Sequence, residues 1–154
     1  MDKKALFAML NEALALEQAL IEAQSTMSAR AADGDLRQAA GIAGHDDEHH
    51  LVLVQRMLGD LGGRVEAPSM DQVAWIEALV RNVSTTDDDL ERLGLVRMLK
   101  MRAVAHEEIF DRIRFTMGNP PEMEPLVVIL RQDHEHAQRY AEIEMRLATR
   151  QVML

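Results

Sequence analysis

Apolar residues recur at alternating steps of three and four along four long stretches of the chain, the pattern of helices with one buried face. In the last stretch an acid and an imidazole, one turn apart, interrupt this face. Its members are Leu126, Ile129, Asp133, His136, Tyr140, Ile143 and Leu147. An earlier stretch has the same interruption, and its members are Leu36, Ala40, Ala43, Asp47, His50, Val54, Met57 and Leu61. Burying a carboxylate is costly unless it is paired or bound to a metal, so both interruptions need an explanation.

Turn-forming residues divide these stretches into two helical hairpins. The first hairpin is predicted to consist of helices over residues 3–31 and 35–61. Gly34 ends the first of these helices, and Asp35 caps the second. The second hairpin begins with a helix that is capped within residues 84–87 and ends at Met117.

The connection between the hairpins is long and contains a short helix of its own. Ser69 and Gln72 have the spacing of a capping box, which predicts a helix over residues 70–82. After the turn that follows Met117, the two prolines at 120–121 open a last helix that runs to about 149. The prediction is an all-α domain over residues 1–154, a four-helix bundle with one long crossover between helices two and three.

The polar residues of the four core faces are predicted to meet in one layer. Glu17, Asp47 and His50 lie at similar distances from the first turn, and His106, Asp133 and His136 lie at similar distances from the second. Antiparallel helices joined by short turns bring such positions to the same height. Glu107 lies beside the core face of the third helix. The candidate metal ligands are Glu17, Asp47, His50, His106, Glu107, Asp133 and His136.

Carboxylate oxygen and imidazole nitrogen together suit iron, manganese or zinc, and an oxygen-rich set favours iron or manganese. Three carboxylates could partly neutralise two divalent ions. Two alternatives remain open. One is a metal-free bundle whose buried acids and histidines bond to each other, acting as an interaction or regulatory module. The other is a single-ion carrier or sensor.

Composition narrows the class of protein without deciding its function. Hydrophobic residues make up 47% and aromatic residues only 3%, which favours helix-on-helix packing. A net charge of −9 argues against nucleic acid or an anionic membrane as a partner. Without cysteine, zinc–thiolate sites and disulfides are excluded. No signal peptide or spanning segment is recognisable, so we expect a cytoplasmic protein.

Three blocks of sequence resemble the ferritin-like di-iron superfamily, most closely bacterioferritin and rubrerythrin. They are Leu10-Asn11 followed by Glu17, Asp47-x-x-His50 with the ending Leu61-Gly62-Gly63, and the segment Ile129–His136. The resemblance implies a ferritin-like bundle with two non-haem iron ions, or two manganese ions. It also implies oxidation of Fe(II) or reduction of O2 or peroxide.

The chain departs from the family pattern at three places. Asp47 and Asp133 stand where the family has glutamates, and they are one methylene shorter. The third helix offers His106 or Glu107 where the family has a glutamate, so the site could hold two ions at altered spacing or only one. Glu48 stands where some bacterioferritins have a haem-binding methionine, and we expect no haem. Exposed apolar helix faces predict a homodimer.

Overall fold

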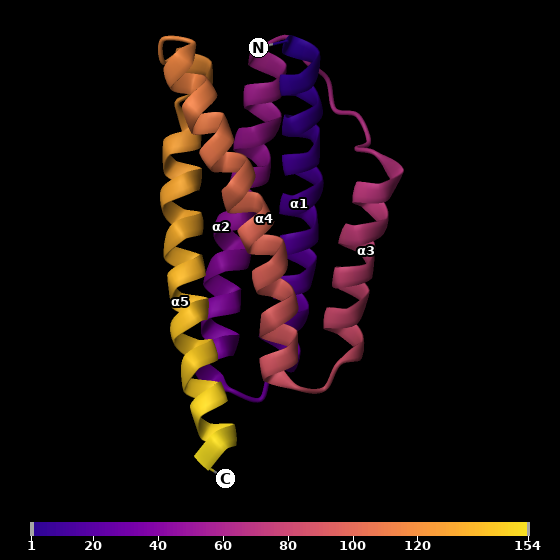
Figure 1. The fold of residues 1–154 in the computed structure, drawn as a ribbon, viewed down its shortest axis with the longest axis vertical. Coiled ribbons are helices and arrows are strands. Elements are labelled where there is room, and N and C mark those ends of the chain that lie inside the picture. Colours follow the sequence, from indigo (N-terminus) through magenta and orange to yellow (C-terminus); the bar gives the residue numbers. More distant parts are fainter. Residues whose placement is uncertain (1, 154) are drawn as a thin grey trace.

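The computed structural model describes residues 2–153, which form a bundle of long helices with a shorter helix on its outside (Figure 1). The elements are α1 (Lys3–Arg30), α2 (Gly34–Asp60), α3 (Met70–Thr85), α4 (Asp89–Thr116), the 3-10 turn η1 (Pro121–Met123) and α5 (Pro125–Met153). No strand occurs within residues 2–153. The prediction of an all-α bundle is confirmed.

The long helices form two antiparallel hairpins, α1–α2 and α4–α5, as the turn signals predicted (Figure 1). Between the hairpins the chain returns along the outside of the bundle, so that α3 packs against α1 and α4. The single long crossover is therefore also confirmed. None of the helices in the described part of the chain is long and apolar enough to cross a membrane.

The helix ends differ in detail from the sequence prediction. Asp33, not Asp35, is the N-cap of α2: its carboxylate accepts from the amide of Leu36 at 3.0 Å, and Gly34 is the first helical residue. The capping box at Ser69 and Gln72 is present, but α3 continues to Thr85. Asp88 caps α4, so the cap lies just beyond the predicted residues 84–87.

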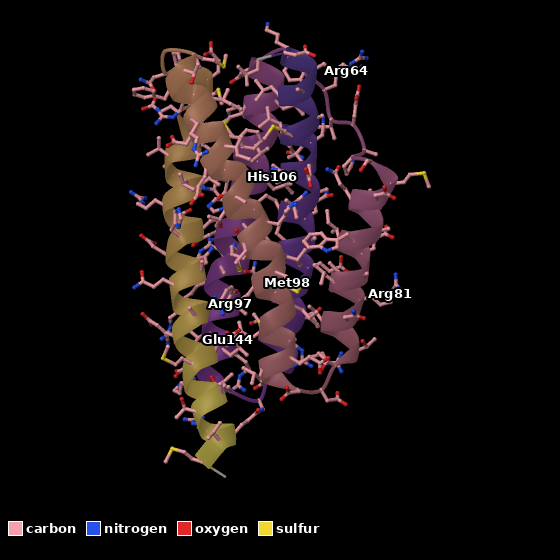
Figure 2. All side chains as sticks on the ribbon, viewed as in Figure 1. Arg64, Arg81, Arg97, Met98, His106 and Glu144 are labelled. Carbon is pink, nitrogen blue, oxygen red and sulfur yellow. The ribbon has the colours of Figure 1, made fainter. Side chains whose placement is uncertain are left out.

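The crossover is fastened to α1 by one buried side chain, that of Asn11. Its amide nitrogen donates to the carbonyl oxygen of Arg64 at 3.0 Å, and its amide oxygen accepts from the backbone N–H of Glu66 at 2.7 Å. Figure 2 shows Arg64 at the start of this connection. Both bonds satisfy backbone groups outside any helix, and so they fix where the crossover leaves α2.

The apolar core is divided into two parts by a layer of buried polar residues. One part, near the α1–α2 turn, contains Leu20, Met27 and Leu36, and the other, near the start of α1, contains Leu6, Leu10 and Met57. Along α5 the change occurs between Ile129 and Tyr140, and along α2 it occurs between Ala43 and Leu53. The predicted polar residues occupy the interval between the two parts.

Candidate metal centre

Three helices bring four side chains of the types that bind metals together in the polar layer. Glu17 comes from α1, Asp47 and His50 come from α2, and Asp133 comes from α5. One donor atom from each lies within 4.8 Å of all the others, and the four residues are buried. The four residues lie at similar distances from the turns of their hairpins, and this places them at the same height in the bundle.

His50 points one ring nitrogen into this cluster and the other away from it. Its Nδ1 lies 3.1 Å from Asp47 Oδ1, 3.5 Å from Asp133 Oδ1 and 4.0 Å from Glu17 Oε2. Its Nε2 lies 2.7 Å from the side-chain oxygen of Gln132, an acceptor, and therefore carries a proton. The bond to Gln132 holds the ring so that Nδ1 faces the acids, as second-sphere partners of ligand histidines do.

The centre also contains a cation that the core pattern did not include, the ammonium group of Lys100 on α4. Lys100 is fully buried, and its Nζ donates to Asp47 Oδ2 at 2.9 Å, to Asp133 Oδ1 at 2.9 Å and to His136 Nδ1 at 3.1 Å. Burial lowers the pKa of Lys100, but Asp47 and Asp133 outweigh it and hold that pKa well above its usual value. The lysine is charged.

His136 is joined to Lys100 rather than to an open position. An ammonium group only donates, so His136 Nδ1 is the acceptor, and its Nε2 faces Asp46 Oδ2 at 2.7 Å. Asp46 is only partly buried, and its carboxylate lies against this ring. Both nitrogens of His136 therefore have partners in the protein.

Burial and the neighbouring charges shift the pKa values of the acids in this layer in different directions. Burial, together with the charges of Asp47 and Asp133, raises the pKa of Glu17 well above its usual value. Burial and a hydrogen bond to Asp133 likewise raise the pKa of Glu107. Burial opposes the ionisation of Asp133, yet Lys100 and the bond from Glu107 hold its pKa well below the usual range. Asp133 is thus the ionised partner, and Glu107 donates a proton to it.

The structure separates the two candidates from the third long helix. Glu107 is buried against Asp133, within the layer. His106, which is labelled on α4 in Figure 2, instead faces α1, and its Nε2 is 2.8 Å from Glu12 Oε2. Of the seven candidate ligands, the structure brings Glu17, Asp47, His50, Glu107, Asp133 and His136 into one layer, and it leaves His106 outside.

Two further buried side chains, those of Gln24 and Tyr140, hold the carboxylate of Asp47 in place by hydrogen bonds. Gln24 donates to Asp47 Oδ2 at 2.6 Å, and its amide oxygen accepts from the hydroxyl of Tyr140, also at 2.6 Å. All three side chains are buried. Burial raises the pKa of Tyr140 far above its usual value, so the hydroxyl keeps its proton and donates it to Gln24. This chain fixes which oxygen of Asp47 remains turned toward the cluster.

The buried atoms of this cluster that lack hydrogen-bond partners could be satisfied by one divalent ion. Among the buried side-chain atoms without a hydrogen-bond partner are Glu17 Oε2 and His50 Nδ1, which face each other in the cluster at 4.0 Å. Buried acceptors without a partner are costly, and a cation among them removes that cost. The charges of Asp47 and Asp133 also favour a cation here, since they raise the pKa of His50 despite the opposing effect of burial.

Two spaces reach this layer from different sides. A cavity of about 10 Å³, close to the volume of one water-sized probe, is lined by Glu17, Glu107 and apolar side chains such as Val54 and Phe110. A larger surface pocket of about 220 Å³ lies between α2 and α5, and its lining includes Asp46, His136 and Tyr140. The surface pocket therefore borders the polar layer from outside, whereas the small cavity borders it within the core.

Comparison with solved structures identifies the architecture. The chain is similar to a crystal structure described as ferritin like, diiron-carboxylate proteins from Bacillus anthracis str. Ames. The TM-score is 0.73 at 17% sequence identity, over 94% of this chain and 99% of the other. The fold is ferritin-like. No protein-family model and no curated protein sequence matches the chain.

The expected resemblance to ferritin-like di-iron proteins is thus confirmed at the level of the fold, and a buried group able to hold a metal ion accompanies it. The sequence prediction did not include Lys100 in the core face. A signal for it was available, because Val96, Lys100, Ala103, Glu107 and Phe110 also follow steps of three and four. That alternative face contains both polar residues that α4 contributes to the layer.

Proposed function

We propose that this protein is a ferritin-like, non-haem metal-binding protein that holds a divalent transition-metal ion through Glu17, Asp47, His50 and Asp133. The observation that carries the proposal is the convergence of these four buried donors within 4.8 Å. Two of them, Glu17 and His50, present an atom that has no hydrogen-bond partner. A bundle that needed only a packed interior would not leave such atoms facing one another.

Oxygen-rich ligation with one imidazole favours iron, followed by manganese and zinc. Bound Fe(II) would supply one electron to O2 or peroxide and would itself be oxidised to Fe(III). The residues of the chain would bind this ion and hold its ligands in a fixed orientation. Gln132 fixes the ring of His50, and Gln24 fixes the carboxylate of Asp47. The small cavity beside Glu17 and Glu107 excludes bulk water and suits an occupant no larger than a few atoms.

A metal-free bundle is the second candidate, and Lys100 is the observation in its favour. Its ammonium group already pairs with Asp47 and Asp133, so part of the buried negative charge is balanced without any ion. This candidate predicts that neither chelators nor added ions change the stability of the protein. It gives no partner to Glu17 Oε2 or His50 Nδ1.

Titration of chelator-treated protein with Mn²⁺ or anaerobic Fe²⁺, combined with elemental analysis, tests the proposal. We expect saturable binding by the wild type. We also expect that His50→Ala binds at least about tenfold more weakly, because His50 supplies the only nitrogen donor of the group. His106→Ala, which removes a buried histidine outside the cluster, should leave the affinity unchanged, and so should the exposed control His134→Ala.

Absence of saturable binding by the wild type would decide for the metal-free bundle. Equal affinity of the wild type and His50→Ala would contradict the ligand assignment. Oxygen consumption and the absorbance of Fe(III) during addition of Fe²⁺ then measure the redox part of the proposal. Reaction with O2 or peroxide, a homodimeric state and a cytoplasmic location belong to the same proposal, and size-exclusion chromatography with light scattering measures the oligomeric state.

A further inference from the structure

The two Asp-x-x-His motifs resemble each other in sequence but not in their contacts. In the first motif, His50 Nδ1 faces the acids without a hydrogen bond. In the second, His136 Nδ1 accepts a hydrogen bond from Lys100 Nζ at 3.1 Å. The same Nζ contacts the aspartate of each motif. The histidine of the first motif therefore presents a ring nitrogen without a partner, whereas the ring nitrogen of the second motif is bonded to an ammonium group.

We infer that the ammonium group of Lys100 takes the position of a second metal ion, so that the centre binds a single ion per chain. The inference rests on the proposed function and makes it more specific. It replaces the expected two-ion centre by a pair of unlike cations, one a metal ion and one a side chain. The single ion is held on the side of Glu17 and His50, and Asp47 and Asp133 lie between it and the lysine.

The geometry leaves no room for an ion on the side of His136. Metal–ligand distances to oxygen and nitrogen are about 2.0–2.2 Å. An ion bound by Asp47 Oδ2, Asp133 Oδ1 and His136 Nδ1 would have to lie where their lone pairs converge. All three atoms already direct those lone pairs at Lys100 Nζ, at 2.9, 2.9 and 3.1 Å. The ammonium group is fully buried and its stem is enclosed by the core.

Charge balance supports the same count. The layer contains the carboxyl groups of Glu17, Asp47, Glu107 and Asp133. Because Glu107 donates its proton to Asp133, three charged carboxylates remain. One divalent ion and one ammonium group neutralise these three, whereas two divalent ions and the ammonium group would leave two excess positive charges in a dry interior. An excess of either sign there is costly, because a buried charge without a partner is poorly stabilised. The lysine thus limits the number of ions by charge as well as by volume.

Counting bound ions in the wild type and in Lys100→Met tests the inference. Methionine keeps the unbranched apolar stem and most of the length of the side chain but has no ammonium group and no charge. Arg102→Met is the matched control, since it removes another cation of α4, one that is half exposed and paired with Glu12 at 3.1 Å. Each protein is freed of metal, titrated with Mn²⁺ and examined by elemental analysis and by electron paramagnetic resonance, which distinguishes an isolated Mn²⁺ ion from a coupled pair.

We expect one isolated ion per chain in the wild type and in Arg102→Met, and a coupled pair in Lys100→Met. Two ions in the wild type would overturn the inference and leave the proposed function intact. A count of one in both the wild type and Lys100→Met would also overturn it, because the lysine would then not be what excludes the second ion. A count of zero throughout would overturn the proposed function itself.

Lys100→Gln provides a second variant if Lys100→Met does not fold. Its amide can still donate to Asp133 or His136 while lacking the charge, and the same increase to two ions is expected. Circular dichroism establishes that each variant is helical before the ions are counted. The wild-type count does not depend on any variant, and by itself it can contradict the inference.

Discussion

At the scale of single residues, Glu107 and Asp133 form a pair in which one carboxyl group is neutral and the other is charged. Burial and the hydrogen bond to Asp133 raise the pKa of Glu107, while Lys100 holds the pKa of Asp133 low. At neutral pH Glu107 therefore behaves as a donor and resembles an amide. Asp133, in contrast, is a counter-charge of the buried lysine at 2.9 Å.

This difference predicts unequal costs for two conservative substitutions. Glu107→Gln keeps the donated hydrogen bond and should lower the free energy of unfolding by about 1 kcal/mol or less. Asp133→Asn removes a counter-charge of a fully buried ammonium group and should lower it by about 3 kcal/mol. Urea denaturation at pH 7 in the presence of a chelator measures both values. Equal losses for the two variants would contradict the assigned protonation states.

The residue scale is also where prediction from sequence was least complete. The pattern identified Glu17, Asp47, His50 and Asp133, which the structure brings within 4.8 Å of one another. It did not identify Lys100, because a lysine is ordinarily exposed and only acids on two other helices make its burial favourable. That information depends on how the helices are rotated, which a repeat of apolar positions on one helix defines only approximately.

At the scale of the helices, the extent of each element followed from its own sequence, whereas the ends depended on contacts with other elements. Both Asp33 and Asp35 flank Gly34, and local rules allow either to cap α2. Asp33 is the cap, and it also pairs with Arg146 of α5 at 2.8 Å. Its own backbone N–H donates to Asp89 of α4 at 2.9 Å. The cap thus ties one end of the bundle together.

This junction gives the stability of the bundle a defined pH dependence. Arg146 lowers the pKa of Asp33 from 3.8 to about 2 in the folded protein. Since the folded pKa is the lower one, the stabilisation is complete above about pH 4 and is lost as the pH falls toward 2. Solvent around this end of the bundle screens the pair, and we expect a contribution of about 1 kcal/mol at pH 7.

Asp33→Asn isolates this contribution, because asparagine can still cap α2. The variant should be about 1 kcal/mol less stable than the wild type at pH 7, and the difference should disappear as the pH approaches 2. Urea denaturation at a series of pH values measures the difference. Asp35→Asn is the control, since Asp35 is more exposed and lies 3.3 Å from Arg146. A difference between the wild type and Asp33→Asn that does not change with pH would contradict the electrostatic origin.

At the scale of the whole molecule, the polar layer lies between two apolar cores that belong to opposite halves of the bundle. An ion in this layer would connect α1, α2 and α5 at mid-height, so its binding should stabilise the entire fold. At a free ion concentration 100 times the dissociation constant, the stabilisation is about 2.7 kcal/mol. For a domain of this size that corresponds to a rise in Tm of roughly 5–11 °C.

Thermal denaturation with and without Mn²⁺ measures this rise. Wild-type protein should show it, and removal of the ion by a chelator should reverse it. In His50→Ala the rise at the same ion concentration should be reduced, because its affinity is lower. A wild-type Tm that is insensitive to both Mn²⁺ and chelator would favour the metal-free bundle.

The covalent attachment of a cation to α4 has a consequence for how the protein is made. In a site built of acids alone, a newly synthesised chain would bring like charges together before any metal arrived. Here Lys100 is part of the same chain as those acids, so the native bundle can form before the proposed ion binds. We therefore expect cells starved of transition metals to accumulate this protein folded, ready to be loaded when the supply returns.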